Sequence, residues 1–316
     1  MDNKLIVTAA PHITGADSTS KIMQRVCLAL VPSLIASVVI FGISSLILTA
    51  VTVAACVLFE YGYCKLMGRE IPIGDFSAVV TGMLLAFNMP AGMPVWMAVV
   101  GAFIAIVIVK QLFGGLGFNF ANPAIVGRIA LALGYTGAMT TYPYPNNGID
   151  ALSAATPLAV ASELGAGEYM TLLLGNHGGV FGETCAIALI VGGLYLIVTK
   201  VISPMIPVSY LATVAVLSFA FGMDPVVQLL SGGVLLGAFF MATDYVTSPT
   251  TEKGKLIFGI GLGVITMMIR AFGTMNEGVS FAILLMNLVV PYIEVLTRQD
   301  KLGIAKVKKE KEGAAK

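Results

Sequence analysis

The chain has 316 residues, 57% of them hydrophobic and 11% charged, with a mean hydropathy of +0.92 and a formal net charge of +1. This composition excludes an ordinary soluble domain. Because the apolar residues come in blocks of 16 to 21, we predict membrane-spanning helices rather than barrel strands. The near-neutral charge indicates no particular partner. We expect contact with the lipid bilayer, because the chain is so apolar, and no contact with nucleic acid. Residues 1–20 lack the pattern of a removable signal peptide, and the first helix is expected to direct insertion.

Ten apolar segments are predicted to span the membrane, between a cytoplasmic N-terminal segment (residues 1–25) and a basic cytoplasmic tail (298–316). Residues 26–138 form a first five-helix repeat and residues 180–297 a second, separated by an extracytoplasmic loop of residues 139–179. The ten segments are 26–42, 45–62, 74–89, 95–113, 121–138, 180–199, 207–223, 225–243, 255–271 and 277–297.

Two of these segments carry irregular sequence at one end. The third ends in the run Asn88-Met89-Pro90-Ala91-Gly92, and the fifth follows the glycine-rich residues 114–123. Such interruptions are typical of broken helices that line a path enclosed by protein. We therefore expect the third and fifth segments to be broken helices.

The basic residues define the orientation. With the N-terminus in the cytoplasm, 16 of the 18 Lys and Arg residues fall on cytoplasmic ends and loops, and residues 134–179 contain none. The exceptions are Arg128, inside the fifth segment, and Arg270, at the outer end of the ninth. We predict a multi-pass protein of a bacterial or archaeal cytoplasmic membrane with both termini inside. The charges of the tail are more typical of a solvated terminus than of a binding site.

The two halves of the sequence resemble each other. Residues 81–85 are similar to 232–236 at an offset of 151, and two further pairs recur at offsets of 158 to 159. A repeat with an odd number of spans must be inverted in the membrane, which favours a pseudo-symmetric central site. The alternative is chance similarity among segments rich in glycine and leucine.

The chain offers few metal ligands. Its four cysteines have no C-x-x-C spacing and lie in or beside apolar segments, so we expect small hydrophobic side chains rather than a self-contained iron–sulfur cluster. A cysteine completing a site shared with another subunit remains open. His12 and His177 lie outside the spans, and no haem is expected.

The extracytoplasmic loop contains a heptad of small and polar residues, Asp150-Ala151-Leu152-Ser153-Ala154-Ala155-Thr156. An exposed hydroxyl between small neighbours is a good acceptor, and a phosphoester through Thr156 would anchor a flavin without altering its ring chemistry. The heptad also fits an ordinary helix start, with Ser153 or Thr156 as N-cap and Pro157 at the first helical position. Sequence physics alone favours the helix start.

A family resemblance reverses that preference. The heptad matches the pattern D-x-x-S-[GA]-A-T recognised by the transferase that attaches FMN to threonine, with Asp150, Ser153, Ala155 and Thr156 at its fixed positions. Residues 3–300 resemble the family that includes the D subunit of Rnf complexes and, more distantly, the B subunit of sodium-pumping NADH:quinone oxidoreductases. The supporting segments are 122–124 with Arg128, 182–185, and 241–251; the departures from the common pattern are Ala154 and Cys185.

The resemblance implies a subunit of a redox-driven ion pump, an enzyme only as part of a translocase. Electrons would pass between ferredoxin and NAD while Na⁺ or H⁺ crosses the membrane. FMN would be covalent on Thr156, and relatives suggest a second, noncovalent flavin, riboflavin. The implied partners are the A, B, C, E and G subunits of the Rnf complex, and a flavin transferase during maturation. The alternative is a cofactor-free inverted-repeat channel or solute transporter; a quinone-binding enzyme is a weaker third interpretation.

Ionisable groups within the bilayer are functional candidates because burying them is costly. For most acids near the spans we favour snorkelling or helix-end capping, but not for Glu183 and Asp244. Glu183 is expected in the first turn of the sixth span, on the flavin side. Asp244 opens a hydroxyl-rich run with Thr247 and Ser248 that suits an ion path, although such a run also satisfies backbone groups at a broken helix end. The acids in or at the edges of the spans are Glu60, Asp75, Glu183, Asp224, Asp244, Glu277 and Glu294.

Arg128 needs a partner if it is buried near mid-span. A flavin phosphate or a buried acid would serve, and with the former Arg128 is a candidate neighbour of the flavin. The alternative is an interfacial position.

Overall fold

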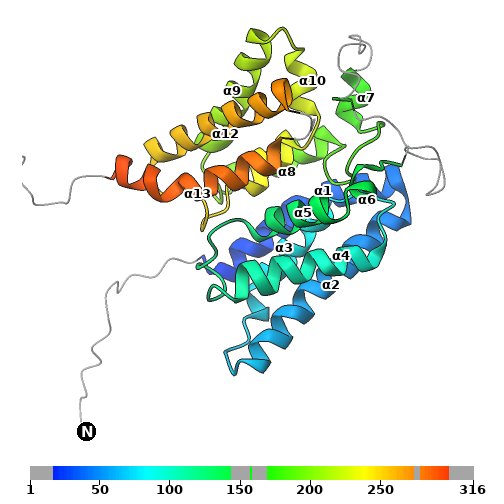
Figure 1. Cartoon of the computed structure of the whole chain (residues 1–316), viewed down its shortest axis with the longest axis vertical. Coiled ribbons are helices and arrows are strands. Elements are labelled where there is room, and N and C mark those ends of the chain that lie inside the picture. The colour runs from blue at the N-terminus through cyan, green and yellow to red at the C-terminus, as the bar shows by residue number, and fades with distance from the viewer. Residues whose placement is uncertain (1–16, 144–156, 159–168, 274–277, 299–316) are drawn as a thin grey trace, which may run out of the picture.

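The computed structural model describes residues 17–143, 157–158, 169–273 and 278–298. Within these residues every regular element is a helix, which confirms the predicted all-α membrane fold. Figure 1 shows the helices of the first half gathered on one side of the molecule and most of those of the second half on the other.

Most elements overlap the predicted segments, but α1 begins at Thr19 rather than at residue 26 and α8 begins at Ala186 rather than at residue 180. The first half contains α1 (Thr19–Phe41), α2 (Ile43–Leu66), the short 3₁₀ helix η1 (Ile73–Asp75), α3 (Ser77–Ala86), α4 (Val95–Phe103) continued by the π-helix η2 (Ile104–Gln111), α5 (Pro123–Gly134) and α6 (Thr136–Thr140). The second half contains α7 (Tyr169–Leu174), α8 (Ala186–Val198), α9 (Met205–Ala220), α10 (Pro225–Leu230), α11 (Val234–Leu236) continued by the π-helix η4 (Gly237–Met241), α12 (Glu252–Phe272) and α13 (Val279–Thr297).

The third and fifth segments form short helices. α3 has 10 residues and α5 has 12, so at 1.5 Å per residue each covers about half of a hydrocarbon core of roughly 30 Å. Asn122 starts α5 by accepting a hydrogen bond from the N–H of Ala124 at 3.0 Å, with Pro123 at the first helical position.

The expectation of one continuous helix over residues 225–243 is wrong. The segment is divided at residues 231–233, between α10 and α11, because Gly232 and Gly233 adopt left-handed conformations with φ of 65° and 73°. A residue with a side chain rarely adopts these angles, so the pair of glycines ends one short helix and starts the next. The eighth span is therefore a third broken helix.

The two halves present their elements in a parallel order. α2 packs against α3 and α4, and α9 packs against η4 and α12, so in each half a long helix contacts a half-helix and the helix after it. The halves meet where α1 packs against α8 and where α5 packs against α13. The five-helix repeat, and the inversion of one repeat relative to the other, stay predictions.

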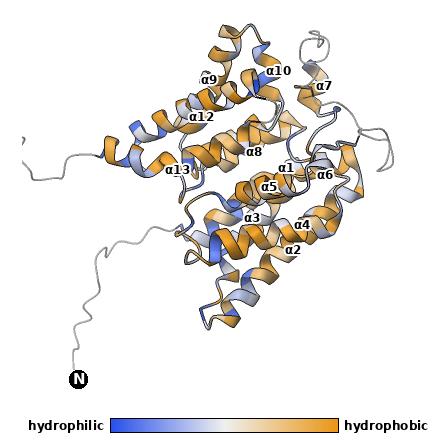
Figure 2. Cartoon of the chain, viewed as in Figure 1, coloured by the Kyte–Doolittle hydropathy of each residue, from blue (hydrophilic) through white to orange (hydrophobic). Residues whose placement is uncertain are grey.

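The helices expose apolar side chains and enclose polar ones. Val39 in α1 is 73% exposed and Phe219 in α9 is 81% exposed, whereas Glu60 in α2 is fully buried. Figure 2 shows that most of the helical surface is hydrophobic. Four described helices, α1, α2, α12 and α13, are long and apolar enough to cross a membrane, and five shorter apolar helices accompany them. The chain is therefore a multi-pass membrane protein.

Candidate functional site

Arg128 and Glu183, expected as neighbours of one site, lie together in the structure. Arg128 projects from α5 with 7% of its surface exposed, and its Nη2 lies 3.8 Å from Oε1 of Glu183. Its Nη1 donates to the hydroxyl of Ser280 in the first turn of α13. A buried acid therefore accompanies the arginine.

Glu183 lies beside the break in the eighth span. It precedes α8, which begins at Ala186, so the expectation that it occupies the first turn of its own helix is wrong. A Cβ added to Gly233 would come within 2.1 Å of Oε2 of Glu183, so the carboxylate closely approaches the residue before α11. The dipole that the carboxylate meets is that of α11 and η4 rather than that of α8.

Arg270 fixes the other side of this break. From α12 its guanidinium donates to the main-chain oxygen of Gln228 at 2.6 Å and to Oε1 of the same residue at 2.9 Å. It also donates to the carbonyl oxygens of Ser231 at 3.0 Å and Gly232 at 3.2 Å. The three main-chain oxygens among these acceptors lie at or just after the C-terminal end of α10, where carbonyl groups receive no hydrogen bond from within the helix. The arginine thus supplies the hydrogen-bond donors that the free carbonyl groups of a broken helix need inside a membrane protein.

The residues next to the heptad form a small cavity. Asp150, Ser153, Ala155 and Thr156 lie outside the described residues, but Pro157, which follows Thr156 in the chain, lines a cavity of about 20 Å³. That space holds a water molecule or one small polar group, not a flavin ring. The full lining is Pro157, His177, Gly178, Gly179, Val180, Glu183, Thr184 and Gly232.

A buried charged cluster lies near the C-terminal ends of α2 and η2, and the sequence interpretation missed it. Lys110 and Glu60 form an ion pair at 2.7 Å, and Gln111 Nε2 donates to the same Glu60 oxygen at 2.7 Å. Lys110 Nζ also donates to Ser77 Oγ at 2.6 Å. Glu60 was expected to snorkel or to cap a helix end, and this expectation is wrong because its side chain is fully buried against Lys110, which is itself 2% exposed.

A second cavity, of about 90 Å³, separates the halves near this cluster. Lys110, Asn119 and Asn122 from the first half and Asp244 from the second are among its lining residues. Thr247 Oγ1 donates to Asp244 Oδ2 at 3.0 Å, so two of the three expected ion-path residues are in contact. The third, Ser248, is buried nearby in the chain with 9% of its surface exposed.

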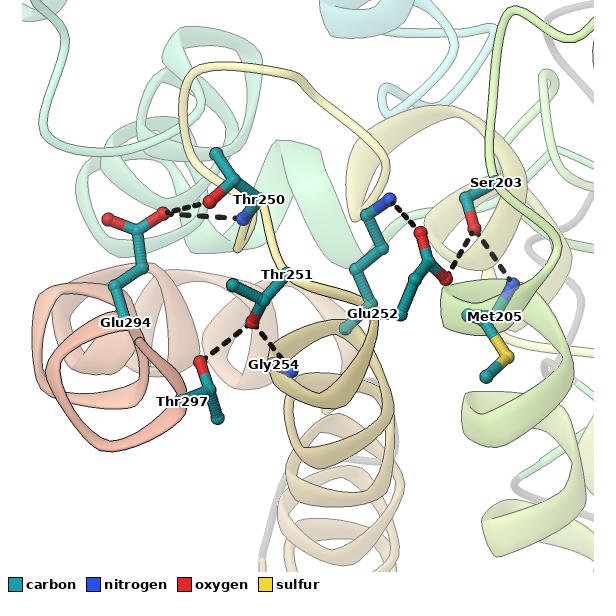
Figure 3. A network of polar contacts seen from close by, with 9 residues as sticks. Ser203, Met205, Thr250, Thr251, Glu252, Gly254, Glu294 and Thr297 are labelled. Atoms are coloured by element: carbon teal, nitrogen blue, oxygen red, sulfur yellow. Dashed lines mark hydrogen bonds and ion pairs between the residues drawn. The ribbon is translucent and has the colours of Figure 1, made fainter. Parts of the chain in front are cut away.

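The later hydroxyls of the same run stabilise helix ends instead. Thr251 Oγ1 accepts from the N–H of Gly254 at 3.0 Å as the N-cap of α12, and it contacts Thr297 Oγ1 at 2.7 Å (Figure 3). Thr250 donates through its N–H and its hydroxyl to Glu294 Oε1, at 3.3 and 3.1 Å. Thr250 and Thr251 therefore stabilise helix ends, which was the alternative to an ion path.

Two further acids act as helix-end groups, as expected. Asp224 caps α10 by accepting from the N–H of Val226 at 2.8 Å, and Asp75 accepts from the N–H of Ser77 at 2.7 Å before α3. Glu277 lies outside the described residues. Outside α10, the Asp224 carboxylate also accepts from the hydroxyl of Tyr169 in α7.

Broken helices, enclosed ionisable residues and an apolar outer surface define a membrane protein with charged groups buried inside its helix bundle. Residues 6–303 match the model of the NQR2, RnfD, RnfE family. The chain belongs to this family.

Several curated relatives cover nearly the full chain. The chain is 48% identical to the D subunit of the Na⁺-translocating ferredoxin:NAD⁺ oxidoreductase complex of Acetobacterium woodii, over 97% of this chain and 98% of the relative. It is 42% identical to the D subunit of the proton-translocating ferredoxin:NAD⁺ oxidoreductase complex of Clostridium ljungdahlii, over 95% and 97%. The D subunit of an ion-translocating oxidoreductase complex of Vibrio cholerae is 35% identical, over 94% and 99%.

Proposed function

We propose that the chain is the membrane-embedded D subunit of an ion-translocating ferredoxin:NAD⁺ oxidoreductase complex. Support comes from relatives so named at 48% and 42% identity over nearly the whole chain. The subunit would act only with its partners, which we expect to be the A, B, C, E and G subunits of the Rnf complex. It would pass electrons between the ferredoxin and NAD sides while Na⁺ or H⁺ crosses the membrane.

The same proposal makes the subunit a flavoprotein with FMN esterified to Thr156 by a flavin transferase. The observation that carries it is the match of Asp150, Ser153, Ala155 and Thr156 to the attachment pattern, in a loop without basic residues. Pro157 lines a cavity beside Glu183, and Arg128 lies 3.8 Å from that acid. Riboflavin is proposed as a second, noncovalent cofactor without assigned residues.

For the ion we propose a path through Asp244, Thr247 and Ser248. Their carboxylate and hydroxyl oxygens are hard ligands of the kind that Na⁺ accepts. Support comes from the contact between Asp244 and Thr247 and from the place of Asp244 on the wall of the 90 Å³ cavity. Lys110 on the same wall supplies a positive charge that would oppose a cation unless Glu60 neutralises it.

The experiment is intact mass and in-gel flavin fluorescence of the denatured chain, produced with its flavin transferase. We expect a mass increment of one FMN that disappears in Thr156→Ala and persists in Thr141→Ala, an exposed threonine after α6. An unmodified wild-type chain contradicts the flavin proposal and favours the cofactor-free channel or transporter, which has no reason to hold a flavin covalently.

A further inference from the structure

A continuous chain of hydrogen bonds leads to the fully buried carboxylate of Glu60. Asp75 Oδ1 accepts from the Ser77 hydroxyl at 2.6 Å, and that hydroxyl accepts from Lys110 Nζ at 2.6 Å. Lys110 Nζ in turn lies 2.7 Å from Glu60 Oε1. All three distances fall in the range over which a proton passes between two groups, about 2.6–3.2 Å.

The two ends of this chain differ in their access to water. Asp75 is half-buried in η1, and its neighbours Gly74 and Phe76 are exposed. Glu60 has no exposed surface. The chain therefore connects the surface of the protein, at the end of the bundle that is predicted to face the cytoplasm, with the interior of the bundle.

The inner end of the chain has an acceptor that is not used. Glu60 Oε1 accepts from both Lys110 and Gln111, whereas Oε2 has no hydrogen-bond partner in the described part of the chain. A buried carboxylate oxygen without a donor is unfavourable, and a proton that binds there removes the negative charge. Glu60 is thus suited to take up a proton.

The intermediate groups are of the kinds that can pass a proton on. A hydroxyl donates and accepts, and the Ser77 hydroxyl does each once in this chain. A buried lysine can release its proton and become neutral, whereas an arginine keeps its proton in proteins. The pair of Lys110 with Glu60 can therefore exist in a charged and in a neutral form, with one proton moved between them.

We propose that this chain is a proton relay between solvent and Glu60. Lys110 gives one proton to Glu60 and becomes a neutral amine. The Ser77 hydroxyl passes its proton to that amine and takes one from the Asp75 carboxyl, which has bound a proton from solvent. The net change is one proton moved from solvent to Glu60, and the other three groups return to their starting state. The relay is separate from the proposed ion path and does not involve a flavin.

The charges around Glu60 are the same in the variants that test the relay. α3 and α4 carry no titratable residue, and α1 carries Lys21, Arg25 and Cys27. The other ionisable groups near the relay are Cys56 and Cys64 on α2, Arg69 beyond its end, Asp75, Lys110, and Asp244 on the wall of the 90 Å³ cavity. Because Ser77→Ala and Lys110→Arg preserve all of these charges, they change the relay and not the field around Glu60.

The experiment is time-resolved infrared spectroscopy of the full chain in lipid nanodiscs, which detects the C=O band of a protonated carboxyl group. Glu60→Gln should remove the band of Glu60, and Glu60→Asp should move it. We expect this band to appear reversibly as the pH is lowered from about 9 to about 4. After a change from H₂O to D₂O, the band should shift at the rate at which the relay delivers deuterons.

Lys110→Arg and Ser77→Ala should each slow this deuterium shift at least about tenfold. Arginine keeps the charge beside Glu60 but does not release its proton, and alanine removes the bridging hydroxyl. Ser77→Thr retains a hydroxyl and should exchange at the wild-type rate. The matched control is Ser37→Ala, which removes a buried hydroxyl that donates to the Leu34 carbonyl of its own helix at 2.8 Å and should also leave the rate unchanged.

A Glu60 band that does not appear over this pH range overturns the inference. A wild-type rate in Lys110→Arg or in Ser77→Ala overturns it too, as does an equal slowing in Ser37→Ala. If Lys110→Arg fails to fold, the contrast between Ser77→Ala and Ser77→Thr still decides. None of these results depends on FMN, so the intact-mass experiment tests the proposed flavin attachment independently.

Discussion

Glu60 and Lys110 form an ion pair at 2.7 Å with both side chains enclosed between α2, α3 and η2. The second carboxylate oxygen, Oε2, has no hydrogen-bond partner within the described part of the chain. Two opposite charges taken out of solvent together are tolerated, but one alone is not. Removing one member of the pair is therefore expected to lower the free energy of unfolding by more than the loss of one hydrogen bond would.

Glu60→Gln and Lys110→Met should each lower the free energy of unfolding by about 3–5 kcal/mol, because each leaves the other charge buried alone. The double variant Glu60→Leu/Lys110→Met should recover most of this loss. Thermal and denaturant unfolding of the detergent-solubilised chain measures both. The matched control is Glu252→Gln, which breaks a more exposed pair with Lys255 at 2.6 Å and should cost much less stability. Equal costs for the buried and exposed pairs would contradict this account.

Gly233→Ala should destabilise the protein more than Gly222→Ala. Both glycines have left-handed φ angles, of 73° and 70°, so backbone strain of about 1–2 kcal/mol is common to the two variants. An added Cβ meets nothing within 4 Å at Gly222 but would lie 2.1 Å from Oε2 of Glu183 at Gly233. Unfolding midpoints compare the two, and a Gly233→Ala protein as stable as Gly222→Ala would show that Glu183 can move away freely.

Arg270→Lys should loosen the break between α10 and α11. An ammonium group cannot reproduce the planar fork that donates to the Gln228, Ser231 and Gly232 oxygens, and a hydrogen bond to a charged donor contributes about 1.5–3 kcal/mol. We expect faster hydrogen exchange in peptides covering residues 225–236. Arg25→Lys, which alters a partly exposed pair with Asp17 at 2.9 Å, is the control and should leave those peptides unchanged. Unchanged exchange in both variants would refute the role of the guanidinium fork.

The contact between Tyr169 and Asp224 should make the docking of α7 on α10 sensitive to acid. The Tyr169 hydroxyl is the main cause that lowers the pKa of Asp224 below its ordinary 3.8; the N–H groups of Val226 and Val227 add to this effect, and burial opposes it. A carboxyl with a lowered folded-state pKa contributes stability above pH 3.8, and this contribution disappears as the pH falls through the folded-state pKa.

Tyr169→Phe removes the main cause, so it should raise the Asp224 pKa and move the acid-induced loss of stability to higher pH. Unfolding midpoints recorded from about pH 2.5 to 6 measure this shift. Tyr292→Phe, in an exposed position of α13, is the control and should follow the wild type. If all three proteins lose stability at the same pH, the Tyr169 hydroxyl does not control Asp224.

Local pattern was sufficient to predict the helices. Apolar blocks, proline and capping residues act within a few positions of each other, so the segments that became α1, α2, α12 and α13 were recognisable directly. The same holds for the N-cap Asn122 before Pro123. The heptad ending at Thr156 is also a local pattern, which is why the flavin proposal rests on sequence.

Other features were decided only by tertiary structure. A charged residue in the last turn of an apolar segment has the same sequence pattern whether it reaches water or a neighbouring helix, so the pairing of Glu60 with Lys110 was not predicted. The two glycines at 232 and 233 did not by themselves indicate a broken helix, because the break depends on Arg270 from α12 binding the freed carbonyls. The sequence by itself determined where most helices lie, and it carries the pattern on which the flavin proposal rests. Helix packing decided which charges meet, because such pairs join residues distant in the chain and depend on the directions in which packed helices present their side chains.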